Sequence, residues 1–334
     1  SQPHSTPAPA HFATPEPAAV APQDDGPVDR TTEEPATPNV DDPSNDADTV
    51  SPGDTAEIDV AAVEAKLKDP GSTMSFEPLT DERIETDSTY DAGTTTQLMW
   101  GARSDVGCVR PHNEDSYLVQ SPLFCVCDGM GGAKAGDVAS KMAVEAFCTQ
   151  MDQLGDLEGP PPAEALLRTA TEDANRVVYL KAQTDADCVG MGTTLVGLIL
   201  QEATLWVVNV GDSRAYRITK GGIRRITRDH SVVEDLVARG DLTPEQARSH
   251  PQKNLITRAL GTSSRVKADL FQETVSPGDA ILLCSDGLVN QVTDQEICQE
   301  IQAGGTAQEI CQRLVTRTLD SGAPDNVTVV LFQL

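Results

Sequence analysis

Acidic residues at the ends of apolar runs are the first feature of this sequence that points to chemistry. They stand in four short motifs: RPHNEDS (110–116), DGMGG (128–132), SDGL (285–288) and DN (325–326). Each motif follows or precedes an apolar run that reads as a strand, so its carboxylate is expected on a rigid element beside a loop. An ionised Asp at the end of a buried strand is costly unless it is paired or bound to a cation.

A shared site for these carboxylates would need a divalent cation, because like charges that converge repel one another. Oxygen ligands without a patterned set of His or Cys favour Mg²⁺ or Mn²⁺. The glycines of DGMGG let the backbone approach closely, which makes the Gly129 carbonyl a further candidate ligand. One Asp-Gly pair by itself is more often a turn. The four motifs together favour a metal site, but they do not identify a reaction.

The elements that must position these motifs follow from the spacing of apolar residues. Strand candidates are the ranges 98–107, 116–120, 123–127, 193–200, 205–210, 214–219, 223–227, 265–275, 280–284 and 327–332. Helical spacing marks 135–151, 163–182, 231–239, 293–303 and 306–320. Short turns separate the four strands between residues 193 and 227, and we expect these strands to form one antiparallel meander. Clustered strands and paired helices predict an α+β fold with antiparallel sheets in layers.

The first 97 residues differ in composition from the rest. They hold 21 acidic and 4 basic residues, so −17 of the net charge of −27 lies there, and they contain no cysteine. Such a segment buries too little apolar surface to offset the entropy of ordering. We therefore expect a disordered acidic tail at 1–97 and a folded domain at 98–334. Ser and Thr beside acidic residues at 86–96 suggest, as a hypothesis, a phosphorylation or docking arm, against the simpler interpretation of a solvated linker.

The folded part is long enough for one domain with a substantial core. Its 31 acidic and 21 basic residues argue against nucleic acid as a partner. Cysteines inside apolar runs, without a CxxC pair, indicate free buried thiols in a reducing compartment, and hence a cytoplasmic protein. No apolar run is long enough to indicate a membrane segment in this chain.

The order of the motifs RPHNEDS, DGMGG, GMGTT, GDSR, SDGL and DN resembles the metal-dependent protein serine/threonine phosphatase family, type 2C, in its bacterial form. The resemblance covers essentially all of 98–334. It implies a four-layer αββα sandwich of two antiparallel sheets flanked by helices. It also implies a monomeric enzyme that hydrolyses phosphoserine and phosphothreonine on proteins, opposes Ser/Thr kinases in signalling, and takes two Mn²⁺ or Mg²⁺ ions.

The resemblance assigns the bridging role to Asp128, which would bind both ions, with the Gly129 carbonyl on one of them. Asp286 and Asp325 would complete the coordination of one ion. Two ions of this kind share a water or hydroxide that attacks phosphorus in line, without a covalent phosphoenzyme.

The remaining roles go to residues around that pair. The resemblance implies that Glu114 and Asp115 act on the other ion mainly through bound water. It implies that Arg110 grips the substrate phosphate, since a guanidinium fork matches phosphate oxygens. Asp187 matches the acidic residue that holds a third, weaker ion in bacterial members.

One departure from the family pattern and one loop bear on substrate chemistry. Met130 stands where many eukaryotic members have a His, so the proton for the leaving oxygen must come from metal-bound water or another group. His112 is a candidate, although a loop role is the simpler interpretation. The segment 240–261 matches the family's flap beside the active site, and Arg248 and Arg258 are its candidates to meet acidic or phosphorylated substrates.

Three other motifs have simpler interpretations. GDSR (211–214) reads as a tight turn whose Asp212 binds backbone amides. Asp229 and His230 read as a hydrogen-bonded loop pair. CQRLVTR (311–317) has the Cys-to-Arg spacing of cysteine-dependent phosphatases, but it lies in a predicted helix without the glycines of a phosphate loop, so we interpret the spacing as chance.

Three alternatives remain open at this point. The first is an inactive relative that serves as a binding module, which the loss of a metal Asp would mark, and none is lost. The second is a phosphatase of the same fold that acts on a regulator of a sigma-factor pathway; such proteins often carry sensor domains, and none is visible. The third treats the tail as an interaction arm with the enzyme attached.

Overall fold

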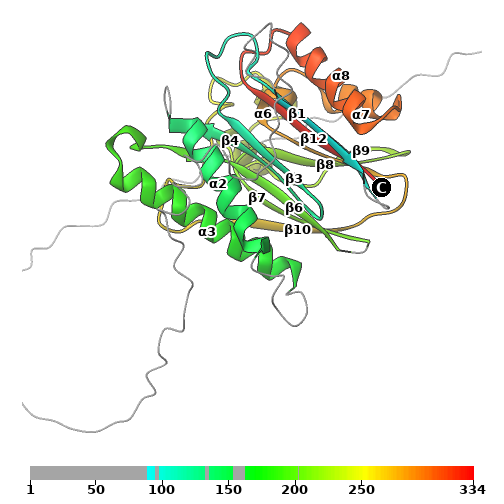
Figure 1. The fold of residues 1–334 in the computed structure, drawn as a ribbon. Coiled ribbons are helices and arrows are strands. Elements are labelled where there is room, and N and C mark those ends of the chain that lie inside the picture. Colours follow the sequence, from blue (N-terminus) through cyan, green and yellow to red (C-terminus); the bar gives the residue numbers. More distant parts are fainter. Residues whose placement is uncertain (1–88, 95–97, 132–134, 153–161, 202) are drawn as a thin grey trace, which may run out of the picture. The chain divides into compact units, whose positions relative to one another are not determined.

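The structure, a computed structural model, describes residues 89–94, 98–131, 135–152, 162–201 and 203–334 (Figure 1). The predicted tail up to residue 88 lies outside the described residues. No helix in the described part of the chain has the length and apolar character needed to cross a membrane.

Sheet A contains six strands in the order β1-β2-β12-β11-β8-β9, each antiparallel to its neighbours. Their bounds are β1 Thr89–Thr94, β2 Met99–Asp105, β8 Arg214–Thr219, β9 Gly222–Arg225, β11 Ala280–Cys284 and β12 Val327–Gln333. The chain thus builds this sheet from four separate regions of the sequence, since three helices lie between β11 and β12.

Sheet B runs in the order β10-β7-β6-β4-β3, with the short strand β5 paired to β4. Its strands are β3 Asp115–Gln120, β4 Leu123–Met130, β5 Gly192–Thr193, β6 Leu195–Gln201, β7 Thr204–Val210 and β10 Asp269–Thr274. The predicted hairpin around residues 116–127 is confirmed as β3 and β4.

Apolar side chains on both faces of the central strands explain the layering. In β4 the run LFCVC is fully buried, and alternate residues point to opposite faces. Phe124 and Val126 belong to the core between the sheets, where Phe124 stacks on Phe332 of sheet A with ring centroids 5.0 Å apart. Leu123 and Cys125 belong to the core beneath the helices.

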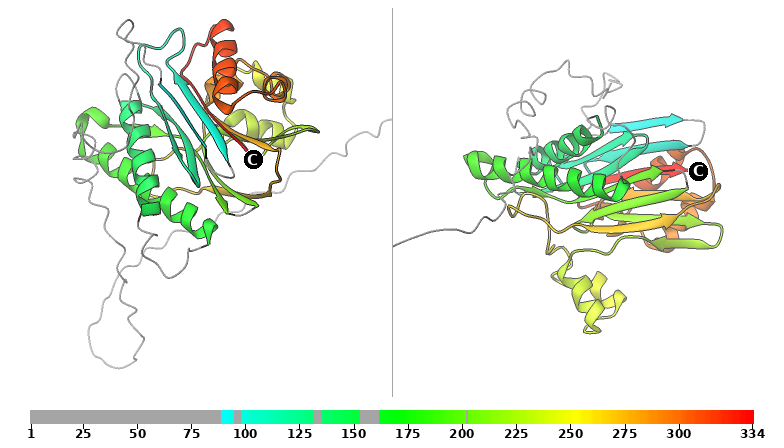
Figure 2. Two further views of the ribbon diagram at one scale, coloured as in Figure 1. Left: turned by 45° about the vertical axis from the view of Figure 1, so that its right-hand side comes forward. Right: turned by 90° about the horizontal axis from the view of Figure 1, so that it is seen from below.

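Helices cover the outer face of each sheet, as Figures 1 and 2 show. On sheet B lie α2 Ala135–Asp152 and α3 Ala163–Thr184, and on sheet A lie α6 Asp286–Val289, α7 Asp294–Gln302 and α8 Ala307–Asp320. The helices α7 and α8 each begin with a capping box, at Thr293 and Thr306. The predicted four-layer αββα sandwich is confirmed.

Two further helices, α4 Val232–Arg239 and α5 Pro244–Arg248, project from the layers and appear yellow-green to yellow in Figure 2. They lie just before and within the segment 240–261, which the sequence analysis matched to the family's flap. Neither contains a buried residue.

All eight cysteines are free, and all but Cys108 are buried, as predicted. Cys311 and Arg317 both lie within α8, so no phosphate-binding loop joins them.

One topological prediction is wrong. The strands between residues 193 and 227 do not form a single meander, because β6 and β7 lie in sheet B whereas β8 and β9 lie in sheet A. The chain changes sheets at the GDSR motif, where Gly211 has a φ of +107°. A Cβ on Gly211 would lie 2.6 Å from the Thr194 side chain. The glycine therefore permits a tight crossing between sheets, and the motif is not a hairpin turn.

The predicted boundary at residue 98 also differs from the structure. The strand β1 falls within the range assigned to the tail, and it pairs with β2 over its whole length, from Thr89 opposite Ser104 to Thr94 opposite Met99. Backbone pairing along the edge of an existing sheet needs no apolar side chains, so the composition of this segment did not reveal it.

Candidate metal centre

Asp115 and Asp128 stand directly opposite each other on the paired strands β3 and β4. Asp115 is buried, with only 7% of the residue exposed, and Asp128 is half-buried. Ser285 Oγ donates to Asp115 Oδ2 at 2.8 Å. Asp115 Oδ1 is buried without a hydrogen-bond partner among the described residues. A buried carboxylate oxygen of this kind is an available ligand atom.

Sheet A brings two further carboxylates to the same end of the sandwich. Asp286 is the first residue of α6, directly after β11, and Asp325 lies just before β12. A Cβ on Gly287 would lie 1.9 Å from the Asn326 carbonyl oxygen, so this glycine lets the two segments touch. The Asp-Gly pair of SDGL therefore opens a helix and does not form a hairpin turn.

The charges of these carboxylates act on one another's pKa values. Burial, followed by the charges of Asp286 and Asp325, raises the pKa of Asp115 to about 7. Burial and the neighbouring Asp325 raise the pKa of Asp286 to about 6. The pKa of Asp128 lies well above its ordinary value because of burial and then the charges of Asp115 and Asp286. Each shift means that the cluster disfavours additional negative charge.

The donor set fits a hard divalent cation. It consists of carboxylate and carbonyl oxygens, and its charges oppose one another unless a cation lies between them. Among the described residues, no three His, Cys, Asp or Glu side chains already converge closely enough to hold an ion. One of the four carboxylates, Asp325, instead receives a 2.8 Å hydrogen bond from Arg110 Nη2.

Glu114 and Gly129 lie beside the Asp115–Asp128 pair. The Gly129 N–H donates to the Glu114 carbonyl at 3.1 Å. Burial raises the pKa of Glu114, although Arg110 acts in the opposite direction. A Cβ on Gly129 would lie 2.0 Å from the Gly136 carbonyl oxygen, so β4 and the start of α2 meet at a distance that only glycine allows.

The loop that carries Arg110 is held by Asn326. Asn326 Nδ2 donates to the carbonyls of Val106 and His112, and its Oδ1 accepts from the Glu114 N–H. Arg110 itself is 46% exposed, so its guanidinium can be reached from solvent. His112 is exposed, and the bond to Asn326 uses its backbone, consistent with the loop role expected of it.

Two residues predicted for the site lie apart from this cluster. Asp187 is exposed on the short 3₁₀ helix Ala186–Cys188, and no described contact connects it to Asp128 or Asp286. Arg258 donates to Asp269 at 2.9 Å and lies 2.9 Å from His230 Nε2. The Arg258 guanidinium is therefore already paired with Asp269 and lies against His230.

Asp212 belongs to the site environment, although the sequence analysis assigned it to a turn. Burial and then the charge of Asp286 raise its pKa well above the ordinary value. It also lines a cavity of about 370 Å³ together with Asp286. The signal was present in the sequence, because Asp212 follows the apolar strand β7 as Asp286 follows β11. Asp212 was nevertheless assigned to a turn, because the motif GDSR resembles one.

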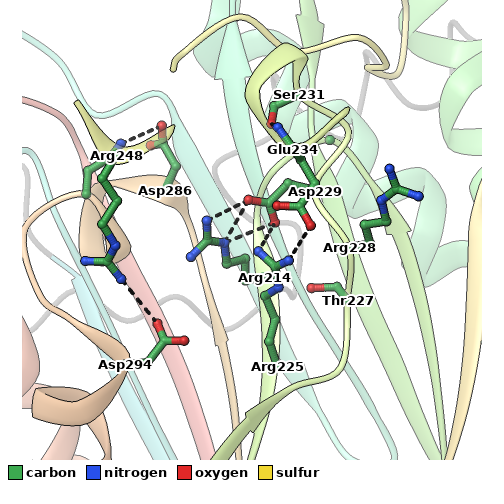
Figure 3. Close-up of polar contacts among 12 residues, drawn as sticks. Arg214, Arg225, Thr227, Arg228, Asp229, Ser231, Glu234, Arg248, Asp286 and Asp294 are labelled. Atoms are coloured by element: carbon green, nitrogen blue, oxygen red, sulfur yellow. Dashed lines mark hydrogen bonds and ion pairs between the residues drawn. The ribbon is translucent and has the colours of Figure 1, made fainter. Parts of the chain in front are cut away.

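The cavity lies between the metal-centre acids and the projecting helices. Its walls come from β8 and β9, from α4 and α5, and from α6 and α7. Figure 3 shows Asp229 in this region, between Arg214 and Arg225. Arg248 lines the cavity and lies 4.0 Å from Asp294.

Comparison with known proteins identifies relatives of this chain. The family model described as protein phosphatase 2C matches residues 111–322. Serine/threonine phosphatase stp of Listeria monocytogenes serovar 1/2a is 38% identical over 236 residues, covering 69% of this chain and 94% of that protein. Serine/threonine protein phosphatase PstP of Mycobacterium tuberculosis H37Rv is 40% identical over 240 residues, covering 72% of this chain and 46% of that protein.

Solved structures of serine/threonine phosphatases are similar to this fold. The crystal structure of the M. tuberculosis phosphatase PstP/Ppp matches with a TM-score of 0.66 and 39% identity, covering 71% of this chain and 98% of that chain. The catalytic domain of PstP in complex with two manganese ions matches with a TM-score of 0.64 and 38% identity, covering 71% and 97% of the two chains.

Proposed function

This chain belongs to the protein phosphatase 2C family, and from that premise we propose that its Asp115–Asp128–Asp286–Asp325 cluster is the metal centre of the reaction. The chain is a metal-dependent protein serine/threonine phosphatase. We further propose that the centre takes two Mn²⁺ or Mg²⁺ ions, and that its substrates are proteins phosphorylated by Ser/Thr kinases.

One observation carries the assignment of the centre. Four carboxylates carried by two different sheets lie at one end of the sandwich, and burial, followed by the charges of neighbouring carboxylates, raises the pKa of three of them. Buried carboxylates of like charge are costly to keep close together unless a bound cation neutralises them. The buried Asp115 Oδ1 without a partner supports the same assignment.

Asp115, Asp128 and Ser285 contribute differently to the proposed centre. Asp128 and Asp115 face each other across β3 and β4, while Ser285 holds one oxygen of Asp115 and leaves the other for a ligand. We assign the Gly129 carbonyl and Glu114 to the edge of the same centre. Bound divalent cations would lower the pKa of a water molecule and polarise the phosphoryl group.

Arg110 is the proposed phosphate-binding residue. Its guanidinium is exposed and lies against Asp325 at 2.8 Å, so it is positioned beside the acidic cluster while remaining accessible. A planar guanidinium binds two phosphate oxygens at once, which orients the phosphoryl group and offsets the charge that develops on it. The third cation site at Asp187 remains part of the proposal, without a described contact to the cluster.

Hydrolysis of a phosphothreonine peptide by the full chain tests this proposal. The protein is stripped with a chelator and then assayed with Mn²⁺, with Mg²⁺ or with neither. We expect activity to return only with a divalent cation. We also expect the double variant Asp286→Asn, Asp325→Asn to lose at least about 10²-fold in kcat, since it removes ligands of the centre.

The matched control is the double variant Asp241→Asn, Asp320→Asn, which changes the charge equally at two exposed carboxylates. It should retain wild-type activity. Metal-independent hydrolysis, or full activity in the Asp286→Asn, Asp325→Asn variant, would overturn the assignment of the centre.

A further inference from the structure

The flap, defined here as residues 232–255, is attached to the sandwich mainly by polar contacts. Its helices α4 and α5 bury no residue. Arg225 on β9 pairs with Glu234 of α4, and Arg228 pairs with Asp235 at 3.2 Å. The flap therefore presents one side to the cavity beside Asp286 without an apolar core to fix it.

The cavity contains four cationic side chains, and two of them are already neutralised. Arg214 is half-buried and binds both carboxylate oxygens of Asp229, with distances of 2.6 to 3.0 Å. Arg225 binds Glu234 and lies 3.4 Å from Asp229. These two guanidinium groups form the wall of the cavity, and their charges are matched by carboxylates (Figure 3).

The other two cationic side chains, Arg248 and Lys253, belong to the flap. The Lys253 ammonium has no ion-pair or hydrogen-bond partner among the described residues. Arg248 is 52% exposed and lies 4.0 Å from Asp294. Asp294 does not depend on it, because the Tyr216 hydroxyl already donates to Asp294 Oδ1 at 3.1 Å. Both flap cations are therefore available to an anion that enters the cavity.

We propose that Arg248 and Lys253 bind a second anionic group of the phosphoprotein substrate, close in sequence to the phosphoserine or phosphothreonine that is hydrolysed. The inference rests on the proposed function, because Asp286 lines both the cavity and the metal centre and so sets the two anions side by side. The substrate class is accordingly phosphoproteins with an acidic or phosphorylated residue beside the target.

The charges of the cavity decide where that second anion lies. Asp212 and Asp286 would repel the second anion from their side of the cavity unless cations neutralise these two carboxylates. Its favourable position is the flap side, between Arg248 and Lys253, away from Asp294. A guanidinium and an ammonium together suit either a carboxylate or a second phosphate. The anion would also add contacts to a flap that lacks apolar ones.

Two sets of peptides test the inference with the full chain and Mn²⁺. In the first set, one Asn on either side of a phosphothreonine is replaced by Asp. In the second set, the same Asn is replaced by a non-hydrolysable phosphonate analogue of phosphothreonine. We expect at least one position at which kcat/KM rises about three- to tenfold over the Asn parent, with a larger rise for the phosphonate.

The double variant Arg248→Gln, Lys253→Gln should lose this preference, so that its ratio of kcat/KM between the Asp and Asn peptides falls to about one. The ratio is measured on a single enzyme, so a general loss of activity cancels. Arg239→Gln is the matched control, because Arg239 is exposed on the same flap and does not line the cavity. It should keep the wild-type ratio.

The outcomes separate the two proposals. Hydrolysis of the Asn parent with equal rates for every Asp and phosphonate peptide overturns this inference and leaves the proposed function standing. A preference that survives in Arg248→Gln, Lys253→Gln also overturns it. No hydrolysis of any peptide by the metal-loaded wild type overturns the proposed function, and the inference with it.

Discussion

Asn326 connects the acidic cluster with the loop that carries Arg110. It accepts from the Glu114 N–H at 2.9 Å and donates to the carbonyls of Val106 and His112 at 2.9 and 3.0 Å. Its own N–H donates to Asp325 Oδ1 at 2.9 Å. At the scale of single residues, the loop that carries Arg110 is therefore held by one amide side chain.

Replacing Asn326 by Ala should raise KM for a phosphothreonine peptide about tenfold and also lower thermal stability. The variant leaves two carbonyls and one N–H without partners, at a cost of about 1–3 kcal/mol in the free energy of unfolding. The measurements are steady-state kinetics and thermal denaturation. Asn254→Ala, at an exposed flap residue, is the control. An unchanged KM combined with reduced stability would show that Asn326 supports only the fold.

At the scale of elements, the flap is the part whose position rests on ion pairs. The Arg225–Glu234 pair ties α4 to β9, and Ser231 caps α4 by accepting from the Glu234 N–H at 3.2 Å. Partly exposed pairs of this kind contribute about 0.2–1 kcal/mol each and weaken with salt. The flap should thus open locally while the sandwich stays folded.

Arg225→Gln should therefore increase the rate of limited proteolysis within residues 232–255 about threefold, without changing the melting temperature of the sandwich by more than a few degrees. Added salt should accelerate wild-type cleavage at the same sites. The control is Arg224→Gln on the same strand, whose partner Glu273 lies on β10 and not on the flap. Equal cleavage rates in all three proteins would contradict the role of the Arg225 pairs.

At the scale of the whole molecule, the buried acids link stability to pH and metal. Asp115 has a pKa of about 7 and Asp286 a pKa of about 6 in the folded protein, against about 3.9 for an Asp in an unfolded chain. The folded state therefore binds more protons than the unfolded state between these values. Stability is greatest below about pH 4 as far as these groups are concerned, and it falls as the pH rises through 6 and 7.

Metal-free protein should accordingly melt at a lower temperature at pH 8 than at pH 5, by several degrees. Saturating Mn²⁺ should remove most of that difference, because the cation binds the ionised carboxylates. Thermal denaturation with chelator and with metal measures both effects. Asp286→Asn without metal should show a weaker dependence on pH. Metal-free wild type that gains stability from pH 5 to pH 8 would contradict the shared buried cluster.

The sequence by itself determined most of the elements and the order of the acidic motifs. Helices, strands and the four acidic motifs depend on local periodicity and on oxygen-rich turns, which neighbouring residues specify. The run LFCVC, which is buried on both faces, was recognisable as a strand. The order of six motifs indicated the family, which the comparisons confirm.

Only the tertiary structure decided which sheet each strand joins and which charges meet. Period-two alternation tells which faces of a strand are buried but not which strand lies beside it, so the crossing at Gly211 and the edge strand β1 went unrecognised. Charge interactions depend on distance in space. The sequence does not give that distance. In the structure Asp212 lies beside Asp286, whereas Arg258, only ten residues from Arg248, is held by Asp269 away from the cavity.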